Sequence, residues 1–217
     1  MTSAWPNLQD LLVSATEAAP VGLVGAPLAA GSVTPGRCDL APAELRKVLR
    51  RIGRYDVETG EEIDSLVADR GDVTLDGLSI EQATAPIRDA VAASVHQHAL
   101  TLLIGGNNAV TRPGVHGIGL PLERVGLITL DAHFDMRDTS EAFSNGNPVR
   151  ALLEDGLPGR NIAQIGLAPF ANSRAMHQDA LAAGNLAITA GYVHEHGIRR
   201  AVERALLHLD HVEAIYV

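Results

Sequence analysis

Residues 126–138 read Gly126-Leu-Ile-Thr-Leu-Asp131-Ala-His133-Phe-Asp135-Met-Arg137-Asp138 and contain the pattern that decides the fold. An apolar run, Val125–Leu130, is followed at once by two aspartates and a histidine at alternate positions. A short run that is apolar throughout predicts a strand of a parallel sheet that is covered on both faces. Because side chains alternate across an extended strand, we expect residues 131, 133 and 135 on one side of the carboxyl end of this strand.

These three side chains have the chemistry of a metal site. Carboxylate oxygen and imidazole nitrogen without thiolate favour Mn²⁺ or a similar divalent ion over a cysteine-rich zinc site. Carboxylates can also bridge two ions, which then share and activate one hydroxide. A simpler interpretation exists, since a D-x-H-x-D pattern also arises by chance and acidic residues after a strand often cap the following helix. The cost of burying two carboxylates and a histidine beside an apolar strand favours the metal.

The rest of the chain alternates similar apolar runs with amphipathic segments. The other predicted strands are Val21–Gly25, Leu100–Gly105, Ile162–Leu167 and Glu213–Val217. The predicted helices are Pro42–Ile52, Ser79–His98, Arg174–Ala183 and Ile198–His211. Ser79 and Gln82 form a capping box at the start of the second helix. This alternation predicts right-handed βαβ units and a three-layer α/β/α fold with a mainly parallel sheet. We expect one domain over residues 1–217, with Arg54–Leu78 irregular.

Composition limits the class of partner. The chain has 217 residues, 46% of them hydrophobic and 20% charged, and a formal net charge of −9. Acidic proteins are poor partners for nucleic acid or an anionic membrane, so a small molecule is the expected partner. The one cysteine, Cys38, cannot form an internal disulfide, and the sequence shows neither a signal peptide nor a membrane-spanning apolar run. We therefore expect a cytoplasmic protein.

The segment Asp131-Ala-His-Phe-Asp135 resembles the D-A-H-x-D signature of the ureohydrolase (arginase/agmatinase) superfamily. Other segments follow in the order of that family: Val21–Pro27 resembles its first strand, Thr34–Arg37 its glycine-containing turn, Leu103–Asn108 the end of its G-G-D-H strand, and Ser144–Pro148 its substrate loop. Together these segments span essentially the whole chain. The resemblance implies an arginase/deacetylase-like fold and a ring-like homo-oligomer.

The resemblance also implies a dinuclear Mn²⁺ centre with Asp131, His133 and Asp135 as ligands. Asn108 stands where the family has a histidine ligand, and an amide oxygen is a weaker ligand than imidazole, so one of the two ions is held less well. The alternative for Asn107-Asn108 is a simple turn. The remaining family ligands come from a later D-x-D motif that this sequence does not contain. We therefore expect that the chain lacks the C-terminal part of its domain and has an incomplete site with little activity.

Asn145 stands where arginases and agmatinases have a proton-shuttling histidine. An amide cannot act as a general acid or base, so no catalytic residue is assigned. His116 lies soon after the Gly105-Gly106 turn and is a candidate to replace part of the missing ligand set.

Two features resemble the formimidoylglutamase branch. The run D-A-H-F-D-M-R, ending at Arg137, is similar to the D-A-H-F-D-L-R of that branch, and Gln164–Ser173 also resembles it. This resemblance implies hydrolysis of N-formimidoyl-L-glutamate to L-glutamate and formamide, a step of histidine degradation. Guanidinium groups are the natural partners of the two substrate carboxylates. The candidate substrate-binding residues are Arg137, Asn145, Asn147, Arg150 and Arg174.

Two alternatives stay open. An agmatinase-like or guanidinobutyrase-like hydrolase would release urea, and a cationic substrate would favour Asp138 and Glu141 over the arginines. A catalytically inactive family member would account for Asn108, Asn145 and the missing ligands.

Overall fold

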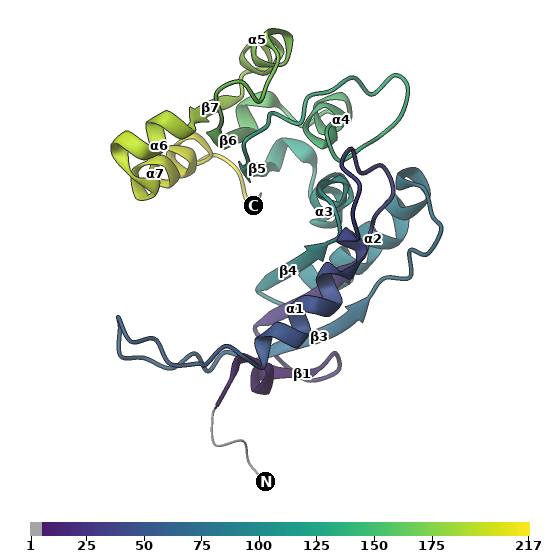
Figure 1. Cartoon of the computed structure of the whole chain (residues 1–217), viewed down its shortest axis with the longest axis vertical. Coiled ribbons are helices and arrows are strands. Elements are labelled where there is room, and N and C mark those ends of the chain that lie inside the picture. The colour runs from purple at the N-terminus through teal and green to yellow at the C-terminus, as the bar shows by residue number, and fades with distance from the viewer. Residues whose placement is uncertain (1–5) are drawn as a thin grey trace. The chain divides into compact units, whose positions relative to one another are not determined.

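The computed structural model describes residues 6–217, and these form two compact units that meet in sequence between Val110 and Thr111. Each unit contains a four-stranded sheet in which every strand pair is parallel, with helices packed against it (Figure 1). The predicted α/β class and parallel pairing are confirmed. The single domain over residues 1–217 stays a prediction, and the start of the chain, where no signal peptide is expected, lies outside the described residues.

The first unit has the strand order β1-β3-β2-β4. Its strands are β1 (Leu12–Ser14), β2 (Val21–Ala26), β3 (Val67–Asp72) and β4 (Leu100–Gly105). Its helices are α1 (Ala41–Leu49) and α2 (Ile80–Val95), with short 3-10 turns η1 (Leu8–Leu11), η2 (Cys38–Leu40) and η3 (Asn108–Val110). The predicted capping box of α2 is confirmed, because Ser79 and Gln82 each accept the other's backbone N–H through their side chains.

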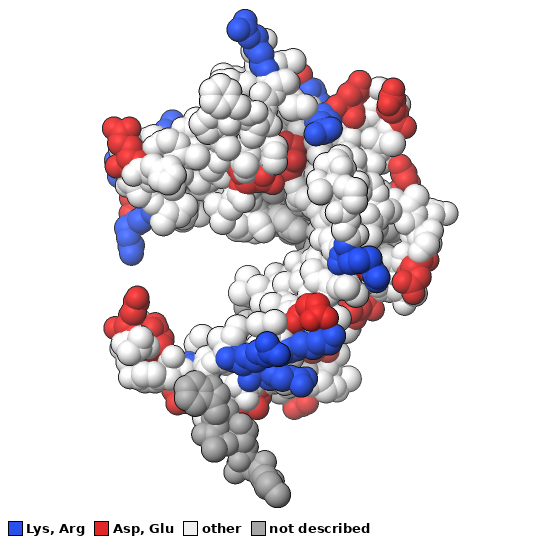
Figure 2. All heavy atoms as spheres, viewed as in Figure 1, with Lys and Arg blue, Asp and Glu red and all other residues white. Residues whose placement is uncertain are grey.

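The expectation of irregular structure throughout Arg54–Leu78 is wrong for β3, which pairs with both β1 and β2. The sequence of β3 is polar and carries a glycine, so it lacks the apolar signal of a strand. The negative charges of β3 are compensated by Arg46 of α1. Its guanidinium donates to both carboxylate oxygens of Asp69, at 2.7 and 2.8 Å, and to Asp72 at 2.6 Å. On the face shown in Figure 2, basic side chains gather over α1. One basic residue of this helix, Arg46, is paired with Asp69 and Asp72.

The second unit has the strand order β7-β6-β5-β8. Its strands are β5 (Val125–Leu130), β6 (Ile162–Leu167), β7 (Leu186–Thr189) and β8 (Ala214–Tyr216). Its helices are α3 (Thr111–Gly117), α4 (Pro148–Glu154), α5 (Arg174–Ala183), α6 (Ala190–His196) and α7 (Ile198–His208), with 3-10 turns η4 (Leu122–Arg124) and η5 (Gly159–Asn161). His194 and His196 lie in α6. The Thr189 side chain caps that helix by accepting the N–H of Tyr192, whose ring stacks on His196.

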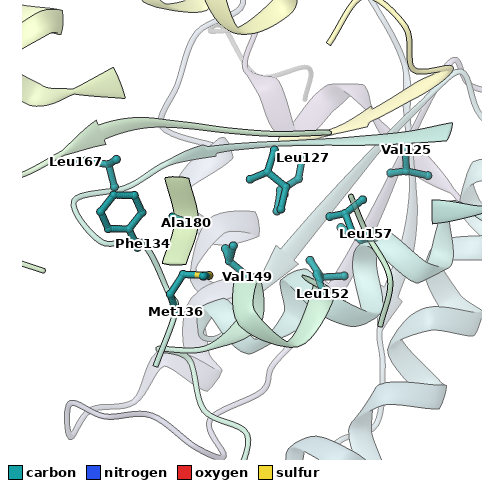
Figure 3. Packing of buried hydrophobic residues seen from close by; sticks show 11 residues of the cluster. Val125, Leu127, Phe134, Met136, Val149, Leu152, Leu157, Leu167 and Ala180 are labelled. Atoms are coloured by element: carbon teal, nitrogen blue, oxygen red, sulfur yellow. The ribbon is translucent and has the colours of Figure 1, made fainter. Parts of the chain in front are cut away.

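The strand β5 is covered on both faces, as its apolar run predicts. Leu127 faces a cluster that includes Phe134, Met136, Val149 and Leu152 (Figure 3). Ile128, the next residue, belongs to a second cluster with strands β6 and β7 and helix α7. Within residues 6–217, no helix is long and apolar enough to cross a membrane.

Candidate metal centre

Asp131 and His133 lie together immediately after β5. The Asp131 carboxylate accepts the backbone N–H of His133 through Oδ1 at 2.9 Å, and the same oxygen lies 3.1 Å from Nδ1 of the imidazole. The two side chains are 33% and 58% exposed, respectively. A carboxylate oxygen and an imidazole nitrogen therefore converge where solvent and a dissolved ion can reach them.

Asp135 is placed differently. Its side chain is buried, at 7% exposure, and its backbone has the left-handed φ of 53°. Such a conformation is uncommon for residues other than glycine and is often found at functional positions. The expectation that residues 131, 133 and 135 alternate along an extended strand is therefore wrong, because β5 ends at Leu130 and the chain bends.

The structure brings together two of the three predicted ligands. Among residues 6–217, no group of three or more His, Cys, Asp or Glu side chains is arranged to hold a metal ion. The donors of Asp131 and His133 nevertheless fit a divalent cation, since neighbouring ligands of a six-coordinate ion at about 2.1 Å are about 3 Å apart. The complete set with Asp135 stays a prediction.

The backbone of this segment is held by side chains far away in sequence. Asn172 accepts the N–H of Phe134 at 2.8 Å and donates to the carbonyl of Ala132 at 2.9 Å. Gln164 of β6 donates to the carbonyl of Phe134 at 3.0 Å. Both residues lie in the stretch Gln164–Ser173 that resembles the formimidoylglutamase branch, but no site role was predicted for either. A glutamine in the otherwise apolar strand Ile162–Leu167 was a signal for Gln164.

The core fixes the other side of the segment. Phe134 and Met136 directly precede and follow Asp135 in sequence, and their side chains are buried in the cluster of Figure 3. The chain of residues 132–136 is thus anchored by apolar packing as well as by hydrogen bonds.

The loop after this segment, residues 138–147, is held together by the side-chain amide of Asn147. Asn147 is almost fully buried, accepts the N–H of Ser144 at 2.8 Å, and donates to the carbonyls of Asp138 and Ala142, both at 3.0 Å. The N–H of Arg137 donates to the carbonyl of Gly146 at 3.1 Å. In this structure the Asn147 amide maintains the shape of the loop, and Asn145 is half-buried beside it.

The candidate arginines are dispersed. Arg150 donates to Asp179 of α5 at 2.5 Å and lines a cavity of about 410 Å³ together with Asp138. Arg174 lines a different cavity, of about 390 Å³, which also contains Phe134, Asn172 and His177. The structure therefore does not bring Arg150 and Arg174 to one cavity.

Two further predicted residues have structural partners. The Asn107 side chain accepts the N–H of Ala109 and donates to the carbonyl of Ala30, so the turn interpretation is confirmed for Asn107. Asn108, a candidate ligand, begins η3 in the first unit.

His116 takes part in an ion-pair cluster between α3 and α4. Its Nε2 lies 2.8 Å from Asp155, which also receives a bidentate contact from Arg112 at 2.6 Å to each oxygen. Burial alone would raise the pKa of the Asp155 carboxyl, but the hydrogen bonds and charges of Arg112 and His116 outweigh it and lower that pKa.

Comparison with known proteins finds similarity to the arginase family. The model of the arginase family matches residues 19–217. A formimidoylglutamase of Halalkalibacterium halodurans is 30% identical over 202 residues, which cover 90% of this chain and 63% of the relative. The formimidoylglutamase of Bacillus subtilis is 30% identical over 158 residues, covering 70% of this chain and 50% of the relative. The mitochondrial agmatinase of Gallus gallus is 29% identical over 159 residues, covering 71% of this chain and 47% of the relative.

Solved structures have the same fold. The crystal structure of the Bacillus subtilis formimidoylglutamase has a TM-score of 0.90 and 25% identity, covering 99% of this chain and 70% of that one. The formiminoglutamase of Trypanosoma cruzi with Mn²⁺ has a TM-score of 0.85 and 23% identity, covering 94% of this chain and 71% of that one. The chain spans between 50% and 63% of the length of the two bacterial formimidoylglutamases.

Proposed function

The chain belongs to the arginase family, and on this premise we propose that it is a metal-dependent hydrolase that cleaves a C–N bond of a linear amidine. The proposed substrate is N-formimidoyl-L-glutamate and the products are L-glutamate and formamide. The observation that carries this proposal is the contact between Asp131 and His133 at the end of β5, within the D-A-H-F-D-M-R sequence. The similarity of the chain to two bacterial formimidoylglutamases supports the choice of substrate.

The proposed cofactor is Mn²⁺, held by Asp131, His133 and Asp135. The donor chemistry of Asp131 and His133 supports it, as does the presence of Mn²⁺ in the Trypanosoma cruzi structure. When bound, the metal supplies a Lewis acid and makes hydroxide available at neutral pH.

Side chains of this protein would bind the substrate through its carboxylates. Arg137, Arg150 and Arg174 are the proposed partners of the glutamate carboxylates, although Arg150 and Arg174 line different cavities. Asn145 is the proposed polar contact from the loop, and Asn147 would act by maintaining the shape of that loop. Arg150 would exchange its contact with Asp179 for a substrate carboxylate. In the balanced reaction, the oxygen of water bonds to the formimidoyl carbon and becomes the carbonyl oxygen of formamide, and the C–N bond to glutamate breaks. One proton of water goes to the glutamate nitrogen and the other to the imino nitrogen, which becomes the amide nitrogen of formamide.

A second candidate is a guanidino substrate that releases urea. The chain is 32% identical over 156 residues to the guanidinobutyrase of Pseudomonas aeruginosa, covering 70% of this chain and 49% of that protein. Asp138 lines the cavity that contains Arg150, so an acidic group is available for a cationic substrate. An inactive family member is the remaining alternative, because Asn108 and Asn145 replace histidines of the family pattern.

Glutamate release from N-formimidoyl-L-glutamate, with and without added Mn²⁺, tests the proposal. The assay compares the 217-residue chain with the longest open reading frame that contains it, and agmatine and guanidinobutyrate complete the substrate panel. Manganese-dependent glutamate release is the expected result. Urea from a guanidino compound would favour the second candidate, and no product from any substrate would favour the inactive one.

The cellular location and assembly are also proposals. We propose a cytoplasmic homo-oligomer that acts on a small molecule and binds neither nucleic acid nor membranes. Light scattering coupled to size-exclusion chromatography tests the assembly, and a monomer at micromolar concentration would contradict it.

A further inference from the structure

Asn172 holds the two residues that flank His133. Its amide nitrogen donates to the carbonyl of Ala132 at 2.9 Å, and its amide oxygen accepts the N–H of Phe134 at 2.8 Å. Both atoms of one side-chain amide are therefore used on the main chain immediately before and after the candidate ligand. The bonds join positions 40 and 38 residues apart in sequence, so they are not the local bonds of a turn.

The main chain at this point needs an external partner. The ladder between β5 and β6 ends near Leu130, with two further bonds from Asp131 N–H to Ile165 and from Ala168 N–H to Ala132. Beyond them the chain bends toward the left-handed Asp135. Asn172 supplies the partner for the N–H of Phe134 that a neighbouring strand would otherwise supply.

A second amide completes the support. Gln164 is fully buried in β6, donates to the carbonyl of Phe134, and accepts from the side chain of Asn185 at 3.1 Å. The N–H and the carbonyl of Phe134 are thus both bonded to side-chain amides, while its ring is packed in the core. Neither amide takes part in the contact between Asp131 and His133 themselves.

We propose that Asn172 is a positioning residue that fixes the backbone on both sides of His133 and so orients its imidazole toward the ion that it shares with Asp131. The inference rests on the proposed metal site. Asn172 acts through Ala132 and Phe134 rather than on the metal. Its loss should weaken metal binding, because residues that orient metal ligands affect affinity without contacting the ion.

The test compares Asn172→Ala with Ser173→Ala in the 217-residue chain. Ser173 is the next residue of the same loop, and its side chain caps α5 by accepting the N–H of Met176 at 3.1 Å. Ser173→Ala therefore removes a hydrogen bond of the same loop without touching the segment of His133. Titration calorimetry with Mn²⁺, amide hydrogen exchange without metal, and the visible absorption spectrum with Co²⁺ are measured for each.

Asn172→Ala should weaken Mn²⁺ binding by about tenfold or more, the size seen when residues that orient metal ligands are changed. It should also speed amide exchange at Phe134 and shift the Co²⁺ spectrum, whereas Ser173→Ala should match the wild type in all three. Equal Mn²⁺ affinity in the two variants, with unchanged exchange at Phe134, would overturn the inference alone. A wild-type chain that binds no Mn²⁺ would overturn the metal proposal and this inference with it.

Asn172→Asp covers the case in which Asn172→Ala does not fold. The aspartate keeps an acceptor for the N–H of Phe134 and loses the donor to Ala132. Without metal, the Phe134 amide should therefore stay protected as in the wild type, while the Co²⁺ spectrum shifts. A spectrum identical to that of the wild type would count against the positioning role.

Discussion

Oδ1 of Asp131 accepts the backbone N–H of His133 at 2.9 Å and lies 3.1 Å from Nδ1 of the same residue. One carboxylate oxygen thus contacts both the main chain and the imidazole of a residue two positions later. The arrangement holds the two donors beside each other before any ion is present, which lowers the ordering entropy that a metal must overcome.

Asp131→Asn should abolish stoichiometric Mn²⁺ binding and leave folding almost unchanged. The amide oxygen of asparagine can still accept the N–H of His133, but the charge that attracts the cation is lost. Metal content after dialysis and the thermal midpoint are the measurements. Asp210→Asn, at an exposed position of the same unit, is the control and should bind as the wild type does. Equal binding by Asp131→Asn and Asp210→Asn would remove Asp131 from the ligand set.

Asp155→Asn should lower the free energy of unfolding at pH 7 by about 2 kcal/mol, because it breaks a half-buried bidentate contact with Arg112 and a contact with His116. The pKa of Asp155 is lowered in the folded chain, so its stabilisation is present above its unfolded pKa, near 4, and is lost as the pH falls through the folded value. Urea unfolding from pH 7 to pH 3 should show the gap between wild type and variant closing in acid. A gap that stays constant would contradict this origin.

Gly106→Ala should destabilise the chain by about 3 kcal/mol through a steric clash with backbone. A Cβ at this position would lie 2.2 Å from the carbonyl oxygen of Leu28, and no side-chain rotation can relieve that contact. Gly36→Ala is the matched control in the same unit, since a Cβ there meets nothing within 4 Å. Chemical denaturation should separate the two variants, and similar midpoints would show that the chain yields at Leu28.

Tyr216→Phe should cost about 1 kcal/mol at neutral pH, the usual net value of one hydrogen bond, here made with Thr111. Burial raises the pKa of Tyr216 to about 12, while the bond to Thr111 opposes this rise. Because the folded pKa exceeds the unfolded value near 10, the wild type should lose stability as the pH rises from about 10 to about 12. The phenylalanine variant should lack this loss. Denaturation at pH 8 and pH 11 measures it, and parallel losses in both chains would assign the effect to another group.

Much of the fold follows from the sequence where one signal dominates. The bounds of β4, β5, β6 and α5 agree with their predicted ranges because each is a short apolar run or a well-delimited amphipathic segment. The strand β3 was missed because its carboxylates are paired by Arg46, which lies more than twenty residues earlier. Tertiary contact, rather than local preference, makes that segment a strand.

The candidate site divides in the same way. Asp131 and His133 were identified from residue type and spacing, and the structure places them in contact. The burial and left-handed backbone of Asp135 were not predicted. The alternation of side chains along a strand does not apply beyond Leu130, where β5 ends. Asn172 lies in the stretch Gln164–Ser173 that resembles the formimidoylglutamase branch, but its role could not be predicted, because its bonds go to a segment about forty residues earlier.

The bonds around Phe134 have a consequence for permitted sequence variation. Its N–H and carbonyl, which any residue except proline provides, carry its hydrogen bonds to Asn172 and Gln164. The ring is packed in the core and stacks on His177, so position 134 should accept other large apolar residues, aromatic ones above all. Asn172 instead contributes through both atoms of its side chain, and among the twenty amino acids only glutamine has the same pair of groups, one methylene too far away. Among natural relatives, drift at the first position and constancy at the second would therefore reflect one hydrogen-bonding arrangement seen from its two ends.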